Sequence, residues 1–393
     1  MGRLVFWLMV AQAALPVAAA NWSSLDRFQQ TITRAEFDKQ LATVYCPSLA
    51  ITNYLMYGTN SVSIFSTTDK TPPPLLTLHF GPSSSTINHK PSSIRRIALD
   101  PGHIGGEWAR MEERLFVRGR DRPVQEAALN LTVARLLKPK LEAAGAVVFL
   151  TKDNFEPVTD KRPEDFRAEA ERDVVAAVPG GISGILDEAN RADAICKRAE
   201  LLFYRNAEIA ARAKRLNEEI KPDLTICIHF NAVEWDQCQS LVDDNRLVVF
   251  VHGNYLSSEL TDDDQKFRLF SKLLEHSCEN ELPVAEALAS ALAKATGLPP
   301  VQYAPTASAI RVGTNAYVYA RNLAANRLIN GPVVFLEPYY MNNRIVYQRI
   351  QLGDYEGARE IEGKPYKSIF REYADALAAG LSEFVPPPGG SKP

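Results

Sequence analysis

The chain has 393 residues, of which 46% are hydrophobic, so it is long enough for two domains and can bury a sizeable core. Its formal net charge of -3 argues against a nucleic-acid-binding protein, because such proteins normally carry a strongly basic face. Its five cysteines are an odd number, and their spacings match no zinc knuckle. The sequence does not select which of them would pair in a disulfide.

Residues 1–20 have the features of a secretory signal peptide. Arg3 forms a basic start, Leu4–Val10 an apolar core, and Ala18–Ala20 a cleavage site of small residues. The apolar core is shorter than the roughly 20 residues that span a bilayer, and no cysteine follows it to carry a lipid. We therefore expect an exported protein, periplasmic or extracellular, that begins near Asn21 and has no membrane anchor after cleavage.

Residues 21–93 are predicted to form a small N-terminal α+β module with a linker. Arg34–Val44 has apolar residues at helical spacing, and Ser61–Thr67 and Leu75–Phe80 have the composition of two strands. Ser83–Ser93 is rich in serine, proline and asparagine, which is typical of a linker.

A larger domain is expected over 94–385, with a disordered tail over 386–393. In this domain, three short apolar strands are each followed by a side chain that can bind a metal or carry a proton. These pairs are Ile97–Leu99 with His103, Leu224–Ile228 with His229, and Val333–Leu336 with Glu337. A single histidine is more often structural, but the carboxyl ends of parallel strands meet at one edge of a sheet, where ligands bind. Together the three strand ends predict one site.

The segment around His103 predicts a βαβ unit. Asp100–Gly102 ends the first strand, Glu126–Ala144 has a helical apolar stripe, and Ala146–Leu150 is the next strand. Such crossovers are right-handed and join parallel strands, so we expect an α/β fold with a twisted, mostly parallel sheet flanked by helices. Glu126 opens the helix, where it either only favours the helix dipole or turns back toward His103. Its order in the chain favours the second interpretation.

Further segments of this domain are predicted from glycine content and apolar spacing. The two glycines of Gly105–Gly106 are expected to leave open space around the ring of His103. Arg205–Ile220 and Tyr366–Phe384 have helical apolar stripes, and Leu247–His252 is predicted as an edge or outer strand.

These features together resemble the zinc-dependent N-acetylmuramoyl-L-alanine amidases of the amidase_3 type, which cleave peptidoglycan. The family pattern has a glycine-rich turn around a histidine, a glutamate that opens the next helix, a strand ending in His-x-Asn, and a late strand ending in glutamate. In this sequence those places are held by Leu99–Gly106, Glu126, Ile228–Asn231 and Glu337. The resemblance covers roughly residues 94–385, with long insertions near 107–122 and 154–201.

The resemblance implies Zn2+ as cofactor, with His103, Glu126 and His229 as ligands and Glu337 as the catalytic base. Two imidazoles and one carboxylate suit zinc and leave a fourth position for water. Such a water is a usable nucleophile at neutral pH, and a glutamate can take its proton and return it to the leaving amine. The bond that the family cleaves joins the lactyl group of N-acetylmuramic acid to L-alanine.

The sequence leaves alternatives for the ligand set. The interval between His103 and Glu126 is long, so other glutamates are candidates for the third ligand. These are Glu107, Glu112 and Glu113. Cys227 shares a strand face with His229 and is a candidate fourth ligand, although a buried apolar filler is the simpler interpretation.

Rival functions are another exported zinc peptidase or amide hydrolase, and a non-catalytic cell-wall binding protein on the same fold. Pro338–Asn342 departs from the family's usual turn, so the choice of substrate is the least defined feature. The N-terminal module either binds cell wall or braces the catalytic domain, and bracing is favoured. The 107–122 stretch either lines a groove for a glycan strand or is a solvated loop, and the 154–201 insertion is expected to be helical. Peptidoglycan is the expected partner, and the sequence identifies no activator protein.

Overall fold

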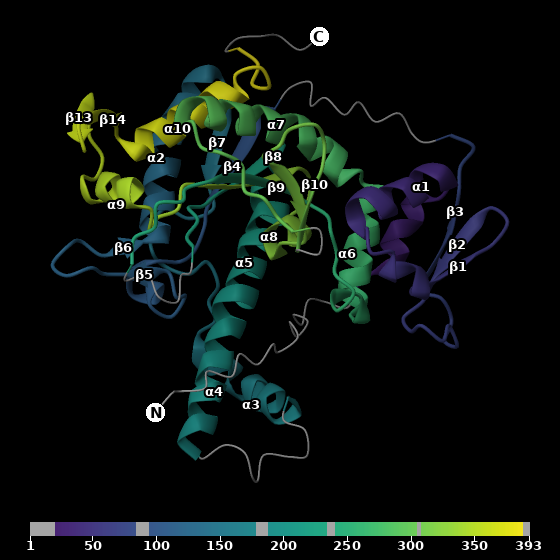
Figure 1. Ribbon diagram of the computed structural model, residues 1–393. Coiled ribbons are helices and arrows are strands. Elements are labelled where there is room, and N and C mark those ends of the chain that lie inside the picture. Colours follow the sequence, from purple (N-terminus) through teal and green to yellow (C-terminus); the bar gives the residue numbers. More distant parts are fainter. Residues whose placement is uncertain (1–19, 84–93, 178–187, 234–239, 305–307, 388–393) are drawn as a thin grey trace.

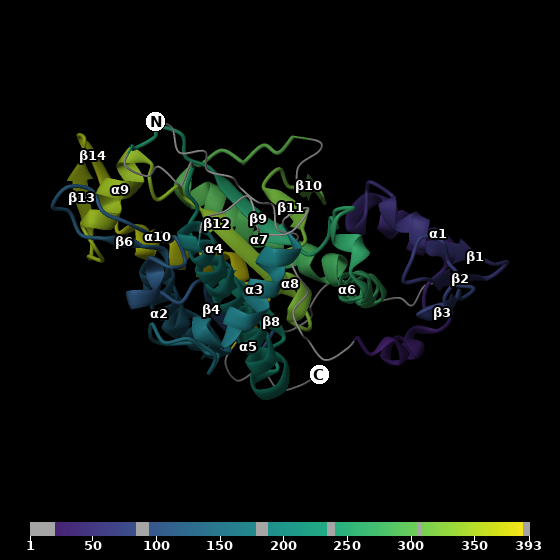
Figure 2. The same ribbon diagram turned by 90° about the horizontal axis from the view of Figure 1, so that it is seen from below.

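The computed structural model describes residues 20–83, 94–177, 188–233, 240–304 and 308–387 (Figure 1). The predicted signal peptide up to residue 19, the linker from residue 84 and the tail from residue 388 lie outside these ranges. The N-terminal module lies beside the larger domain in both views of the molecule (Figures 1 and 2). Within the described ranges, no helix has the length and apolar composition that a membrane span requires.

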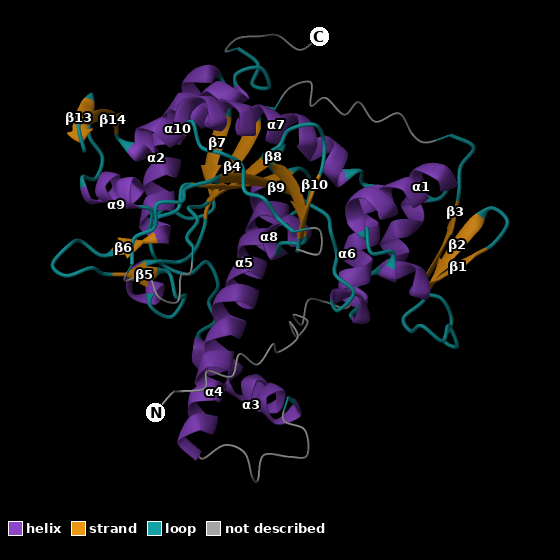
Figure 3. Ribbon diagram, in the orientation of Figure 1, coloured by secondary structure: helices purple, strands orange, loops and turns teal. Residues whose placement is uncertain are grey.

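A seven-stranded sheet forms the centre of the larger domain (Figure 3). Its strands, in spatial order, are β10 (Ala309–Arg311), β11 (Val318–Arg321), β9 (Leu247–Val251), β12 (Val333–Pro338), β8 (Leu224–Ile228), β4 (Arg96–Pro101) and β7 (Val147–Leu150). The strands β12, β8, β4 and β7 are parallel, whereas β9 is antiparallel to β12 and parallel to β11. The predicted α/β class with a mostly parallel sheet is confirmed. The carboxyl ends of β4, β8 and β12 meet at one edge, which positions the candidate site.

The place of β9 in the sheet differs from the sequence prediction. Leu247–His252 is predicted as an edge or outer strand, and this is wrong, because β9 lies between β11 and β12. All five residues of β9 are buried, as a strand covered on both faces requires. Since β9 runs against β12, His252 lies at the opposite edge from Glu337, with its Nε2 3.0 Å from the hydroxyl of Tyr255. His252 is therefore not part of the strand-end site.

Helices cover both faces of the sheet. One face carries α2 (Glu126–Ala144), α7 (Ser277–Thr296) and α10 (Ile369–Leu381), and the other carries α5 (Glu208–Lys214) and α8 (Ala324–Leu328). The predicted βαβ unit is present, because α2 connects β4 to the parallel strand β7. The helix ends at Gly145, whose φ of 110° is the left-handed conformation that glycine favours after a helix.

A helical arm projects away from the sheet (Figure 1). Its helices α3 (Arg167–Ala176) and α4 (Glu188–Leu201) pack on each other. Their small shared core consists of Ala170, Val174, Ile195, Ala199 and Leu202. α4 continues through a π-helical turn, Leu202–Ala207, into α5. The insertion predicted over 154–201 is helical from residue 163 to residue 176 and again from residue 188, whereas residues 154–162 have no regular secondary structure. It has no end at residue 201, because its last helix is an outward extension of the helix that covers the sheet.

The N-terminal module packs against the larger domain through α6 (Asp263–Leu274). The module contains α1 (Arg34–Gln40) and an antiparallel sheet of β1 (Leu55–Tyr57), β2 (Ser61–Ile64) and β3 (Leu76–His79), of which β1 is not predicted. The rings of Phe37 and Phe270 stack with 6.0 Å between their centroids, and the Tyr45 hydroxyl donates to the backbone carbonyl of Lys272 at 2.9 Å. The two parts share one hydrophobic core, which favours the bracing interpretation.

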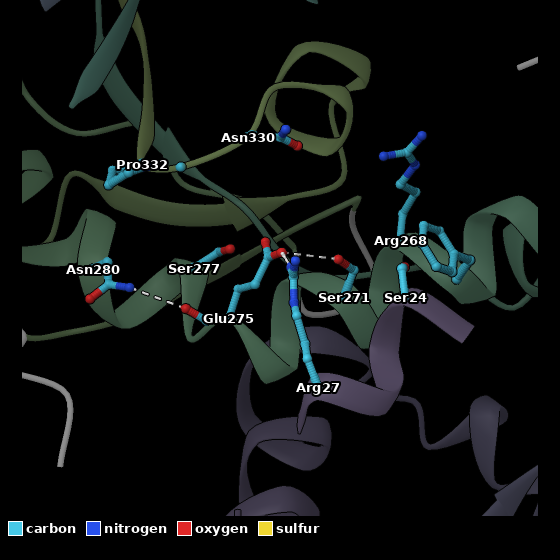
Figure 4. Close-up of a pocket in the computed structure, with 11 residues that line it drawn as sticks. Ser24, Arg27, Arg268, Ser271, Glu275, Ser277, Asn280, Asn330 and Pro332 are labelled. Carbon is cyan, nitrogen blue, oxygen red and sulfur yellow. Dashed lines mark hydrogen bonds and ion pairs between the residues drawn. The ribbon is translucent and has the colours of Figure 1, made fainter. Parts of the chain in front are cut away.

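A cavity of about 390 Å³ lies between the module and the α6–α7 region (Figure 4). Arg27 of the module reaches Glu275 there, with 2.9 Å between Nη2 and Oε1. Pro332, which lines the cavity, immediately precedes β12, whereas Glu337 lies near the end of that strand. The cavity is therefore at the opposite edge of the sheet from the candidate site.

The remaining α-helices and β-strands are short. They are β5 (Leu115–Phe116), β6 (Val124–Gln125), α9 (Arg344–Gln351), β13 (Ala358–Ile361) and β14 (Lys364–Lys367). β5 pairs with β6 just before α2, and β13 pairs with β14 between α9 and α10. The four cysteines within the described residues, Cys46, Cys196, Cys227 and Cys278, are free, and Cys238 lies outside those residues.

Candidate metal centre

β4 delivers His103 to the edge of the sheet where β8 and β12 also end. The strand extends through Pro101, further than the sequence predicts, and Pro101 is in register with Ile228 of β8. Gly102 then brings the backbone against the ring of His229, since a Cβ on Gly102 would lie 2.0 Å from the ring Cε1. A glycine is therefore required at this close approach.

Gly102→Ala is expected to displace the ring of His229, because the added methyl group and the ring cannot both keep their positions. Overpacking of this kind typically costs ~1–3 kcal/mol. We expect a lower melting temperature together with weaker metal binding, measured by thermal denaturation and by titration of the protein with a divalent metal ion. An alanine variant with the metal affinity of the wild type would contradict this account of Gly102.

The space beside Gly105 and Gly106 is filled by neighbouring residues and not open. A Cβ on Gly105 would lie 2.6 Å from Cβ of Ala127, and one on Gly106 would lie 2.9 Å from Cβ of Phe155. The turn is thus packed against the start of α2 and the segment after β7. His103 itself has a φ of 66°, which non-glycine residues rarely adopt, so surrounding contacts must hold it in place.

The structure brings His103, Glu126 and His229 together. His103 Nε2 is 3.1 Å from Glu126 Oε2, and His229 Nδ1 is 2.9 Å from Glu126 Oε1. The centroids of the two imidazole rings are 5.1 Å apart. Each of the three residues offers one ligand atom, and these atoms all lie within 4.8 Å of one another. One metal ion can therefore contact all three side chains.

The electrostatics of this group result from burial, from contacts among its three members and from two charged neighbours, Glu112 beside His103 and Arg114, whose Nε lies 3.2 Å from Glu126 Oε2. Burial would raise the pKa of Glu126, but the charges and hydrogen bonds of His103 and His229 hold it well below its usual range. Burial would lower the pKa of His103, but Glu126 and Glu112 raise it to about 9. The pKa of His229 stays below its usual value, because burial dominates there. At neutral pH the metal-free group thus contains an ionised carboxylate beside a protonated His103.

None of the alternative ligands, all of them among the described residues, joins this group. Two of them, Glu107 and Glu113, are exposed. Glu112 is buried but approaches the other nitrogen of His103, with 3.5 Å between Oε1 and Nδ1. The buried Cys227 thiol lies 3.9 Å from a carboxylate oxygen of Asp100, and burial raises its pKa. Cys227 is therefore a core residue and not a fourth ligand.

Glu337 lies near the end of β12, outside this three-residue group. The side-chain amide of Asn231 donates to Glu337 Oε2 at 3.1 Å. Burial raises the pKa of Glu337 to about 7, and the charge of Arg321 opposes that rise. A carboxyl group with a pKa near neutrality can both accept and release a proton under physiological conditions.

Two charged residues of α5 support the His103 turn, and neither was predicted from the sequence. Arg212 donates to the backbone carbonyls of Pro101 at 3.0 Å and His103 at 2.7 Å. It also donates to the carboxylate of Glu208 at 2.7 Å, and both side chains are almost fully buried. One sequence feature could have identified this pair. Glu208 and Arg212 are four residues apart, and the helical turn that follows them carries the buried apolar residue Leu216.

The parallel strands and the His103, Glu126 and His229 group beside Glu337 define an α/β protein with a metal-competent centre at its strand ends. This arrangement is typical of metal-dependent hydrolases. The Amidase_3 family model, described as N-acetylmuramoyl-L-alanine amidase, matches residues 97–362, more than half of the chain. The chain belongs to this family, and it is an enzyme that acts on peptidoglycan.

Several solved amidase structures are similar to the chain at low sequence identity. The apo form of Ami1 from Mycobacterium abscessus is 17% identical, covers 74% of this chain and 97% of its own, and has a TM-score of 0.37. The catalytic domain of CwlV from Bacillus (Paenibacillus) polymyxa var. colistinus is 15% identical, with coverages of 74% and 98% and a TM-score of 0.39. CwlD from Clostridioides difficile, solved with the GerS lipoprotein, is 14% identical, with coverages of 74% and 98% and a TM-score of 0.39. No curated protein sequence matches the chain.

Proposed function

We propose that this amidase is zinc-dependent, that His103, Glu126 and His229 bind the zinc ion, and that Glu337 is the catalytic base. The observation that carries the proposal is the presence of three ligand atoms within 4.8 Å of one another at the strand ends. Two imidazole nitrogens and a carboxylate oxygen are a typical donor set for catalytic zinc, with the fourth position left for water. Magnesium would instead prefer oxygen ligands throughout.

The residues around this group supply the proton transfers of amide hydrolysis. Zinc, when bound, polarises the amide carbonyl and lowers the pKa of water. Glu337 takes a proton from the attacking water as the water oxygen bonds to the lactyl carbonyl carbon. The C–N bond then breaks, and Glu337 returns the proton to the departing nitrogen of L-alanine. The products are a lactyl carboxylic acid and a free amino terminus, and Asn231 keeps Glu337 oriented during both transfers.

The domain organisation and the location form part of the same proposal. Residues 1–20 direct export, 21–93 form the module that braces the enzyme, and 94–385 form the catalytic domain, followed by a tail over 386–393. Export is supported by the basic and apolar pattern of residues 1–20 and by a substrate that lies outside the cytoplasmic membrane.

Incubation of the mature protein with peptidoglycan is expected to release stem peptides that begin with a free L-alanine amino group, which mass analysis of the soluble fraction detects. A chelator should abolish this release and added zinc should restore it, because the metal polarises the bond that breaks. Cleavage at another bond would favour a different zinc peptidase, and binding without cleavage would favour a cell-wall binding protein. Full activity in metal-free protein would refute the zinc proposal.

A further inference from the structure

We propose that Glu112 is a positioning residue of the metal centre, which holds the ring of His103 through Nδ1 so that Nε2 faces the metal. This inference rests on the proposed zinc site. It concerns a residue of the 107–122 stretch, which is long relative to the family pattern and lies before the first residue of α2. Glu112 would thus give this stretch a function at the metal centre.

The contacts of Glu112 join it to the backbone of the His103 turn and to the ring. Its carboxylate accepts hydrogen bonds from the backbone N–H groups of Ile104, at 2.8 Å, and Gly105, at 3.0 Å. Its Oε1 also lies 3.5 Å from His103 Nδ1, whereas Nε2 of the same ring is 3.1 Å from Glu126. The two carboxylates thus approach different nitrogens of one imidazole, and only Glu126 belongs to the metal-competent group.

With a metal ion on Nε2, Glu112 and His103 would form a carboxylate–histidine–metal triad. A histidine that binds a metal through one nitrogen usually donates its other N–H to a carboxylate or carbonyl, which fixes the tautomer and the ring orientation. His103 needs such support, because its φ of 66° lies in a region that is unfavourable for residues with a Cβ. Glu112 is 2% exposed, so its charge is costly to bury unless these partners offset it.

Packing holds the stretch that carries Glu112 in place. Glu112 N–H donates to the carbonyl of Trp108 at 3.0 Å, and the Trp108 ring contacts Phe203 with 5.3 Å between centroids. Ile104 and Phe203 belong to one small apolar cluster, onto which Trp108 and Leu201 also pack. The root of the helical arm therefore rests on the same stretch. The two long insertions meet beside His103, which gives Glu112 the rigid support that a positioning residue requires.

A purely structural function for Glu112 makes a different prediction. If its carboxylate only caps the turn through Ile104 and Gly105, a substitution lowers stability and leaves the affinity of the folded protein for zinc unchanged. If it positions His103, the affinity for zinc falls even when the fold is intact. Loss of a carboxylate of this kind typically reduces metal affinity ~10–100-fold.

The test compares Glu112→Gln with Glu107→Gln in the full mature chain. Both variants remove one negative charge from the same stretch, but Glu107 is exposed. Glutamine at 112 can keep its oxygen in the place of Oε2, which accepts the backbone N–H groups of both Ile104 and Gly105. We measure the zinc dissociation constant by competition with a chromophoric chelator, and the melting temperature of the metal-free protein. Glu112→Gln should weaken zinc binding ~10–100-fold with little change in melting temperature, and Glu107→Gln should change neither.

A second measurement does not depend on a variant that folds. In the zinc-loaded wild type, nitrogen NMR of the His103 ring should show a protonated Nδ1 and a metal-bound Nε2. A metal-bound Nδ1, or a Glu112→Gln protein with wild-type zinc affinity, would overturn the positioning role while leaving the zinc site intact. A wild-type protein that binds no zinc would instead overturn the proposed function on which this inference rests.

Discussion

Glu337→Gln is expected to reduce amide hydrolysis by about 10²–10⁴-fold, the usual contribution of a general base, while zinc content and melting temperature stay close to those of the wild type. Glutamine can still accept the hydrogen bond from Asn231, but it cannot take a proton from water. Turnover of purified peptidoglycan, zinc content and thermal denaturation measured on the same preparation check this expectation. A variant that loses its zinc would show that Glu337 is a ligand and not the base.

The same substitution should alter the pH dependence of the reaction. Glu337 must be ionised to act as a base, so the wild-type rate should fall as the pH drops through its pKa, which burial raises to about 7 in the metal-free protein. A bound cation favours the ionised carboxylate, so this fall should lie at or below about pH 7 in the loaded enzyme. The residual activity of Glu337→Gln should not show this fall in rate at acidic pH. An unchanged acid limb in the variant would assign that limb to another group.

His103→Ala and His229→Ala are each expected to abolish both stable zinc binding and turnover, because removal of either imidazole leaves two ligands in the proposed site. A wild-type protein with zinc at 100 times its dissociation constant gains ~2.7 kcal/mol of stability from binding, and each variant should lose this increment. Thermal denaturation with and without zinc, together with metal analysis after dialysis, measures both effects.

His79→Ala is the matched control for these two variants. His79 is exposed on β3 of the N-terminal module, and its hydrogen bond to Gln29 uses the backbone N–H, which alanine keeps. Zinc content and zinc-dependent stabilisation should therefore remain at wild-type levels. Retention of zinc in His103→Ala or His229→Ala would contradict the assigned ligand set.

Much of the architecture around the site follows from local sequence features. The apolar strand before His229 and the stripe of Glu126–Ala144 are short-range patterns, and both elements form where the sequence predicts them. A polar side chain directly after a buried strand stands out because a parallel sheet exposes its carboxyl ends to ligands. In a βαβ unit the helix begins at the carboxyl end of the first strand and runs back along the sheet, so Glu126, the first residue of α2, is expected near the strand end that carries His103. For these reasons the sequence points to His103 and His229 and offers Glu126 as one of several glutamates for the third position. The structure then brings Glu126 to the two histidines.

The sequence by itself therefore determined the class of fold, the strands that end at the site and the set of candidate metal-binding and proton-transferring residues. The tertiary structure decided which glutamates of 107–122 face solvent and which one contacts His103. It also decided that β9 lies inside the sheet and runs against β12, and that α4 continues into α5. The physical reason is that strand order, strand direction and the partners of a buried charge such as Arg212 depend on contacts between segments far apart in the chain. The local periodicity of a sequence predicts whether a side chain is buried, but it does not predict which residues that side chain contacts.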